Sequence, residues 1–165
     1  MTHKASGNEA DRTPLSRLTE GALRGIVGYQ LAQAQIVTDG NFDERARRPA
    51  NLRQVEFTIL ALVRANPGLT ARQLARALAV TPPNIAIWLE RLESRALLTR
   101  TRSAKDGRLQ HVELTAAGGA LIAQTTQSLI QGERAMLQAT LSEAEQAMLV
   151  ELLHKMALGR RRGEA

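Results

Sequence analysis

The stretch from Thr70 to Thr115 constrains the fold of this 165-residue chain more than any other part. It contains two helix-start patterns separated by a tight turn. At the first, Thr70 precedes Gln73 by three residues, the spacing at which both side chains bond free backbone N–H groups. At the second, Thr81 precedes Pro82, which is tolerated at a first helical position because its missing N–H would have no partner there. We therefore expect two short helices.

After Leu97 the pattern changes from helical to alternating. Leu98–Arg102 and Leu109–Leu114 alternate in the way typical of strands, and Asp106-Gly107 between them is a strong turn motif. Two helices with a tight turn, followed by a hairpin, indicate a winged helix-turn-helix in which the hairpin is the wing.

Composition favours helices elsewhere. Only four residues are aromatic, so the core must consist of Leu, Ile, Val and Ala. Apolar spacing predicts a long helix over Leu15–Thr38, ended by Asp39-Gly40-Asn41. The segment Asp43–Pro49 is charged and loop-like, and a helix follows over Leu52–Val63. The expected fold is mainly α with a small β-wing.

Two further helices are expected after the hairpin, the second beginning with the capping box of Ser142 and Glu145. The long terminal helices carry more apolar surface than a winged unit could cover, which favours a dimer. The alternative is a monomer in which these helices cap the winged unit. We predict a flexible tail at 1–14 and a single domain at 15–159, with dimerisation helices 15–38 and 116–158 around a DNA-binding unit 51–115, and a basic tail at 160–165.

The charge distribution points to a polyanionic partner. Residues 70–115 hold eight basic and four acidic groups, so +4 of the net +6 lies in this segment, and double-stranded DNA is the expected partner. The chain has no cysteine, which excludes disulfides and thiolate chemistry. Apolar runs are far too short to span a membrane and the N-terminus has no secretory pattern, so a cytoplasmic location is expected.

On the second helix, Ile85, Leu89 and Leu92 share one face and should enter the core, whereas Asn84 and neighbouring residues are left exposed. Asn can pair with adenine, Arg with guanine or phosphate, and Ile with a thymine methyl group. Simple helix initiation is the alternative explanation for Pro83 and Asn84. We expect Trp88 to pack in the core rather than to stack on a base. The predicted DNA-binding residues are Thr70, Arg72, Thr81, Pro83, Asn84, Ile87, Arg91, Lys105 and Arg108.

Lys105 and Arg108 lie at the predicted tip of the hairpin, where a cationic side chain can enter a narrow minor groove. Solubility is the alternative role for these charges. An enzyme finds little support, because the three histidines are far apart and no nucleophile motif or phosphate loop is present. We expect no catalytic residue, metal or cofactor. The rival interpretation is a winged-helix protein-interaction module without sequence-specific DNA binding.

The sequence resembles the MarR (multiple antibiotic resistance regulator) family over nearly its whole length, most clearly at Leu69–Ala75, Leu89–Glu93, Asp106–Arg108 and Val112–Gly118. The resemblance implies a homodimeric repressor, or less often an activator, that binds palindromic promoter DNA and is released by a small molecule. It also implies that Arg108 enters the minor groove. The chain departs from the family pattern at Ala86-Ile87, where many members carry a polar or basic pair, and at Ala96, where glycine is common.

The family usually holds its effector between the dimerisation helices and the winged unit. Tyr29, Gln33, Phe42 and Arg47 are the predicted effector-binding residues, and the run Gly28–Gln35 resembles members that respond to aromatic acids or their thioesters. Arginine would neutralise a carboxylate, and the rings would supply apolar contact. The alternative places Tyr29 in the core and Arg47 in solvent.

Overall fold

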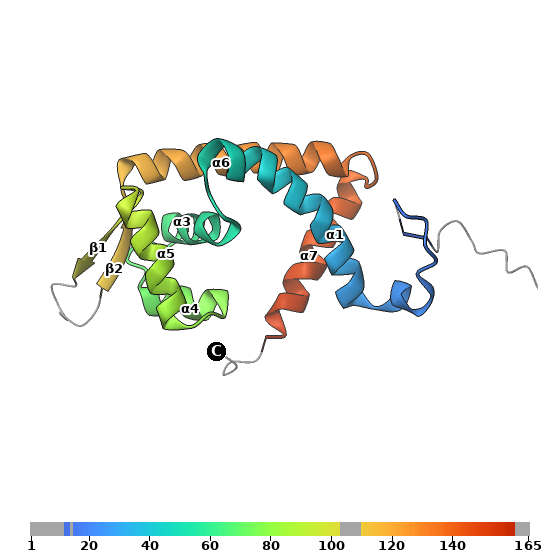
Figure 1. Ribbon diagram of the computed structural model, residues 1–165, viewed down its shortest axis with the longest axis horizontal. Helices are drawn as coiled ribbons and strands as arrows, with labels where there is room; N and C mark the ends of the chain where they lie inside the picture. The colour runs from blue at the N-terminus through green and yellow to red at the C-terminus, as the bar shows by residue number, and fades with distance from the viewer. Residues whose placement is uncertain (1–11, 14, 103–109, 161–165) are drawn as a thin grey trace, which may run out of the picture. The chain divides into compact units, whose positions relative to one another are not determined.

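The structure is a computed structural model in which residues 12–13, 15–102 and 110–160 are described (Figure 1). The chain divides into two compact units, Met1–Gly40 and Asn41–Ala165. Most of the predicted tails 1–14 and 160–165 lies outside the described residues, as do Lys105 and Arg108 at the predicted wing tip. No helix in the described ranges is long and apolar enough to cross a membrane.

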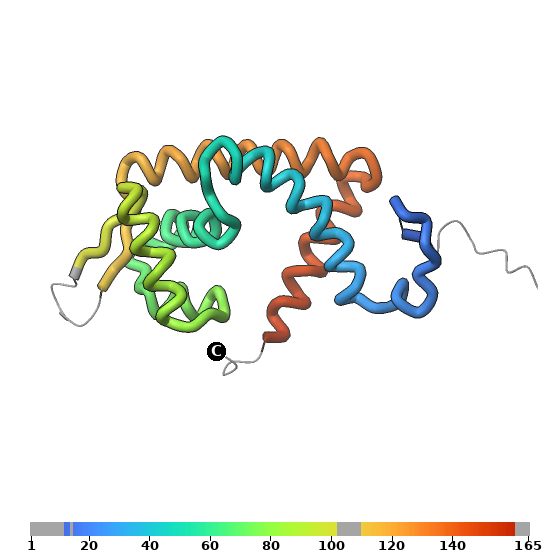
Figure 2. Tube along the Cα trace, viewed as in Figure 1, coloured from blue at the N-terminus to red at the C-terminus, as the bar shows by residue number. Residues whose placement is uncertain are grey.

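The described residues are mainly helical and contain one two-stranded antiparallel sheet, which confirms the expected fold class. Figure 2 follows the course of the chain from the short helices into the hairpin and on into α6. The elements in chain order are the 3-10 helix η2 (Gly21–Gly25), α1 (Val27–Phe42), the π-helix η3 (Asp43–Arg47), α2 (Arg48–Ala50), α3 (Gln54–Ala65), α4 (Ala71–Leu78), α5 (Pro82–Ser94), β1 (Leu98–Arg102), β2 (Gln110–Leu114), α6 (Ala116–Leu137) and α7 (Glu143–Leu158).

The main core of the unit Asn41–Ala165 is aliphatic, as the composition predicted, and a smaller second cluster contains Phe42. The predicted inward face of α5 is confirmed, because Ile85, Leu89 and Leu92 are all buried. Trp88 is partly buried against the same core, in agreement with its predicted packing role. The largest fully buried side chains come from α3, α4, α5, the hairpin, α6 and the segment before α3: Leu52, Glu56, Ile59, Leu60, Leu74, Ile85, Leu89, Leu92, Leu98, Val112 and Ile122.

The hairpin is attached to the loop before α4. Its strands pair in the register Leu98↔Leu114. On the other side of β2, the N–H of Val112 donates to the Leu69 carbonyl oxygen at 2.8 Å, and His111 Nδ1 lies 2.8 Å from the Gly68 carbonyl oxygen. Because both bonds join β2 to residues just before α4, the base of the wing is fixed to the start of that helix.

The predicted helix over Leu15–Thr38 is wrong at both ends. The α-helix α1 begins only at Val27, after the 3-10 helix η2, and Gly21 in η2 has a φ of +54°. The helix then continues through Gly40, where an end was predicted, as far as Phe42. The segment Asp43–Pro49, predicted as a loop, is helical: η3 is followed directly by α2.

Long-range packing explains this continuation of the helix. The Phe42 ring is buried and meets Phe57 edge to face, with ring centroids 5.9 Å apart and an interplanar angle of 76°. The Asn41 amide donates to the Leu129 carbonyl oxygen on α6 at 3.4 Å. A single glycine costs a helix only about 1 kcal/mol, so these contacts outweigh the local preference to stop.

Candidate nucleic-acid interface

The first short helix, α4, begins with the predicted capping box. Thr70 Oγ1 accepts a hydrogen bond from the Gln73 N–H at 3.3 Å, and Gln73 Oε1 accepts one from the Thr70 N–H at 2.9 Å. Arg72, on the first turn of α4, is exposed. The helix ends at Ala79, which adopts the left-handed conformation with φ at +53°, and the tight turn to α5 follows. Thr70 therefore forms the helix start, and Arg72 is accessible beside it.

The second helix, α5, has Pro82 in its first turn, as predicted. Thr81 precedes it in extended conformation, and its hydroxyl makes no capping bond. Thr81, Pro83 and Asn84 are exposed, and the side chain of Ile87 is 61% exposed. The backbone N–H of Asn84 donates to the Thr81 carbonyl oxygen at 3.1 Å, whereas its side-chain amide has no hydrogen-bond partner among the described residues. The start of α5 thus offers a hydroxyl, an amide and an apolar side chain, the groups that recognise base edges.

The base of the wing is tied to α5 by an ion pair. Arg100 on β1 donates from Nε to Glu93 Oε2 at 2.9 Å, and its Nη2 contacts the same oxygen. The hydrogen bond from Arg100 holds the pKa of the Glu93 carboxyl below its usual value. The charge of Arg100 is thereby balanced within the protein, so it is not a free phosphate ligand.

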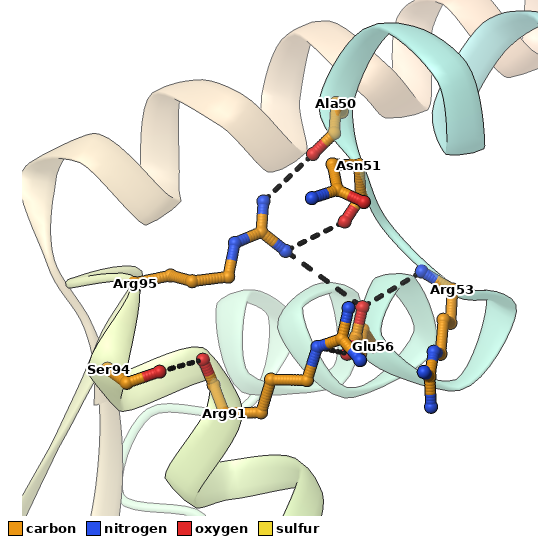
Figure 3. Close-up of polar contacts among 7 residues, drawn as sticks. All are labelled: Ala50, Asn51, Arg53, Glu56, Arg91, Ser94 and Arg95. Atoms are coloured by element: carbon orange, nitrogen blue, oxygen red, sulfur yellow. Dashed lines mark hydrogen bonds and ion pairs between the residues drawn. The ribbon is translucent and has the colours of Figure 1, made fainter.

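Arg91, predicted as an exposed DNA contact, is directed toward α3 instead (Figure 3). Its Nε lies 2.8 Å from Oε1 of Glu56, an ion pair without the alignment of a linear hydrogen bond. The Glu56 side chain is fully buried, whereas that of Arg91 is 36% exposed. The structure therefore engages Arg91 within the protein, where the sequence interpretation assumed a free side chain.

Glu56 and Arg95 are two residues that the sequence interpretation missed. Arg95 Nη1 lies 3.9 Å from Glu56 Oε2, and the same guanidinium donates to the carbonyl oxygens of Asn51 and Ala50. A pattern in the sequence could have identified the carboxylate, because Glu56 has helical spacing with the buried Ile59, Leu60 and Val63. A charge on an apolar helix face predicts a buried ionic partner.

The four predicted effector-binding residues fall in both units. In Met1–Gly40, Tyr29 is half-buried and its hydroxyl donates to Glu20 Oε1 at 3.2 Å, while Gln33 is half-buried on α1. In Asn41–Ala165, Phe42 belongs to the core and Arg47 pairs with Asp43 at 3.0 Å. Phe42 therefore has a packing role, and the exposed Arg47 is balanced by its neighbour on the same turn.

A groove of about 620 Å³ lies between α3 and α6. None of the four predicted effector-binding residues is among its lining residues, which are Ala61, Arg64, Ala65, Ala123, Thr126, Gln127, Ile130 and Gln131. Within the described ranges, no group of three or more His, Cys, Asp or Glu side chains is arranged to hold a metal ion.

The helix-turn-helix, with a hairpin fixed to its base and an exposed polar helix start, is the arrangement of winged-helix DNA-binding proteins, a class that includes transcriptional regulators. The comparisons with known proteins agree. A profile of the MarR family matches residues 50–109. An HTH-type transcriptional repressor from Mycobacterium tuberculosis is 32% identical over 111 residues, which cover 67% of this chain and 79% of the relative. The chain belongs to the MarR family of transcriptional regulators, and it is not an enzyme.

Two solved structures extend the comparison. The transcriptional repressor CouR, bound to a 23-mer DNA duplex, is 31% identical with a TM-score of 0.78, and the match covers 86% of this chain and 99% of that one. BpsR from Bordetella bronchiseptica, in a structure that concerns regulation of its DNA binding by 6-hydroxynicotinic acid, is 26% identical with a TM-score of 0.70. That match covers 79% of this chain and 92% of BpsR.

Proposed function

We propose that this regulator is a homodimeric repressor that binds an inverted-repeat operator and is released from it by a small aromatic acid or its thioester. The observation that carries the proposal is the exposed start of α5, where Thr81, Pro83 and Asn84 are accessible on a helix anchored by its opposite face. The DNA-bound CouR structure, which covers most of this chain, supports the same use of the fold. The cytoplasmic location is part of this proposal, because the protein must share a compartment with promoter DNA.

Within this proposal, Asn84 and Ile87 contact base edges in the major groove. Thr81 and Pro83 lie beside them at the start of α5 and face the same groove. Thr70 and Arg72 at the start of α4 contact the phosphate backbone, which positions the protein without specifying sequence. Lys105 and Arg108, outside the described residues, contact the adjacent minor groove. Arg91 is the one predicted DNA contact that we reassign, because Glu56 engages it.

Dimerisation is supported by the apolar surface of α7. This helix of 16 residues has no buried residue, although Met148, Leu149, Leu152, Leu153 and Met156 are large apolar side chains at helical spacing. Exposure of 38% to 63% for these five residues marks an uncovered stripe. A monomer capped by its own helices would bury this stripe. A second copy is therefore the occupant that we propose, with dimerisation helices at 15–38 and 116–158 around the DNA-binding unit 51–115.

Light scattering tests the dimer. We expect twice the chain mass at micromolar concentrations. Leu153→Lys should shift the protein toward the monomer mass, because a charge would be buried in the interface. The matched control is Glu151→Lys, which also introduces a lysine on the exposed helix α7 but replaces a residue outside the apolar stripe. A concentration-independent monomer would refute this part of the proposal.

The effector class is supported by the BpsR comparison, because 6-hydroxynicotinic acid is an aromatic carboxylic acid. Arg47 is the residue that we propose pairs with the carboxylate, in exchange for Asp43. Tyr29, Gln33 and Phe42 complete the proposed effector-binding set. Titration of the protein–DNA complex with a panel of aromatic acids and their thioesters should find a releasing compound, whose effect is weakened in Arg47→Gln.

Footprinting on the DNA that flanks its own gene tests the function as a whole. The proposal predicts a protected inverted repeat overlapping a promoter. Protection that is independent of sequence would favour the second candidate, a winged-helix interaction module without specific DNA binding. No observation on the described residues favours that second candidate.

A further inference from the structure

A buried carboxylate holds the end of the recognition helix α5. The Glu56 side chain on α3 is fully buried, and a buried charge is costly unless it is paired and hydrogen-bonded. Its partners come from two elements. The Arg53 N–H donates to Oε2 at 2.9 Å as part of the capping box of α3, and Arg91 Nε lies 2.8 Å from Oε1.

Arg95 joins this carboxylate to the backbone just before α3 (Figure 3). Its Nη1 donates to the Asn51 carbonyl oxygen at 2.8 Å, and its Nη2 donates to that of Ala50 at 2.9 Å. Nη1 also lies 3.9 Å from Glu56 Oε2. A planar guanidinium can serve several acceptors in fixed directions, whereas a lysine ammonium acts as a point charge. Arg95 therefore holds the last turn of α5 in position through its hydrogen bonds and also helps to neutralise Glu56.

The bonds of Arg95 and Glu56 lie at the C-terminal end of α5, so a change there alters the position of the proposed DNA-contacting end of the helix. Between this cluster and the start of α5 the buried face is apolar, through Ile85 and Leu89, and apolar contacts are non-directional. Asn84 lies about 16 Å along the helix axis from Arg95. A tilt of about 5° at the Arg95 end would move the Asn84 end by more than 1 Å, beyond the roughly 0.5 Å tolerance of a recognition site.

We propose that Arg95 is a positioning residue for operator recognition, which acts with Glu56 and Arg91 to set the orientation of α5 without touching DNA itself. The inference rests on the proposed function, because it assumes that α5 contacts the operator. It assigns Arg91 to the same positioning group. Specificity in this chain then depends on a charged cluster at the C-terminal end of the recognition helix, as well as on the residues at its start.

The test compares two DNA duplexes, the wild-type protein and four variants. Binding to the footprinted operator and to a scrambled duplex of equal length is measured by fluorescence anisotropy at several salt concentrations. The variants are Arg95→Lys, which keeps the charge but loses the planar guanidinium, Arg95→Gln, which removes the charge, Glu56→Gln, which removes the charge of the carboxylate, and the control Arg64→Lys. Arg64 is exposed on α3 and donates only a long bond of 3.5 Å to the Gly119 carbonyl oxygen.

We expect both Arg95 variants to lose at least about tenfold in operator affinity, with scrambled-DNA affinity within about twofold of wild type. The salt dependence should stay unchanged even in Arg95→Gln, because no phosphate contact is lost. Arg64→Lys should match the wild type. Glu56→Gln, which keeps the side-chain volume, should also lower the affinity for the operator relative to the affinity for scrambled DNA.

Other outcomes overturn the inference in distinguishable ways. If the slope of log affinity against log salt concentration falls by about one in Arg95→Gln, Arg95 is a phosphate contact. Equal losses on both duplexes, in proportion to the unfolded fraction seen by thermal melting, would make its role only structural. Unchanged operator affinity in Arg95→Lys would refute positioning while leaving the proposed function intact. A wild-type protein that does not distinguish the two duplexes would overturn both.

Discussion

Gly118 and the Leu97 carbonyl group approach so closely that position 118 cannot hold a side chain. A Cβ at Gly118 would lie 1.8 Å from the Leu97 carbonyl oxygen. The approach is held by Thr115, whose hydroxyl donates to the Ala96 carbonyl oxygen at 2.7 Å and accepts from the Gly118 N–H at 3.0 Å. The start of α6 is thereby packed against the turn that follows α5.

Gly118→Ala should therefore lower the free energy of unfolding by about 2 to 4 kcal/mol, because the obstacle is backbone and cannot rotate away. The measurement is urea denaturation at fixed protein concentration. Gly119→Ala is the matched control. A Cβ there meets nothing within 4 Å, so alanine should raise helix stability by about 0.5 to 1 kcal/mol. Equal effects of the two changes would show that the close approach does not form.

Ala96 carries the departure from the family pattern at the turn before Leu97. The structure retains the left-handed conformation there, with φ at +53°, although alanine adopts it at a cost of about 1 to 2 kcal/mol. Ala96→Gly should therefore raise the free energy of unfolding by up to about 1 kcal/mol, seen as a higher midpoint of urea denaturation. Ala86→Gly, within α5, should instead lower stability by about 1 kcal/mol. A loss of stability in Ala96→Gly would contradict the left-handed turn.

Gly132 allows α6 to pass close to the side chain of Asn41. A Cβ at position 132 would lie 2.2 Å from Asn41 Oδ1. Gly132→Ala should be destabilising because it displaces the bond from Asn41 to the Leu129 carbonyl oxygen. The cost should fall by at least about 0.5 kcal/mol when Asn41→Ala is also present, which a double-mutant cycle by denaturation measures. If the effects of the two changes on the free energy of unfolding were strictly additive, Gly132 and Asn41 would not be in contact.

These close contacts explain how far the sequence could predict the fold. The Thr70 capping box, Pro82 in the first turn of α5 and the hairpin are local patterns, whose bonds join residues near in sequence, and the structure confirms them. The continuation of α1 past Gly40 could not be predicted in this way. It depends on Phe42 meeting Phe57 and on Asn41 meeting α6, and neither partner is evident from the local composition.

In the candidate site, too, contacts within one helix could be predicted and contacts between helices could not. Helical spacing predicted correctly that Asn84 and Ile87 are exposed on α5. It did not predict that Arg91 pairs with Glu56, because that carboxylate lies 35 residues earlier on another helix. Spacing within one helix shows which side chains leave the core, but not which of them find an ionic partner elsewhere.

Asn84 is the residue on which we expect base recognition to depend most. Asn84→Ala should weaken operator binding by roughly 10- to 100-fold, because a bidentate contact to one base is lost. Binding to scrambled DNA should not change. Gln124→Ala on the exposed side of α6 is the control, and competition titrations against both duplexes are the measurement. Equal affinity for the operator before and after the change would remove Asn84 from the interface.

Arg108, outside the described residues, is predicted to contact the minor groove through a cationic side chain. Arg108→Ala should weaken binding to operator and scrambled DNA alike and reduce the slope of log affinity against log salt by about one. Titrations at several salt concentrations measure both quantities. An unchanged slope would exclude the wing tip from DNA contact.

A two-fold dimer that presents two α5 helices to one inverted repeat requires a fixed spacing between the half-sites. The direct measurement is the affinity for the footprinted operator compared with the same operator lengthened by about half a helical turn between its half-sites. A rigid dimer holds its two helices about one helical turn of DNA, or 34 Å, apart. We expect the insertion to reduce affinity to the level of scrambled DNA. Equal binding to the two duplexes would contradict it.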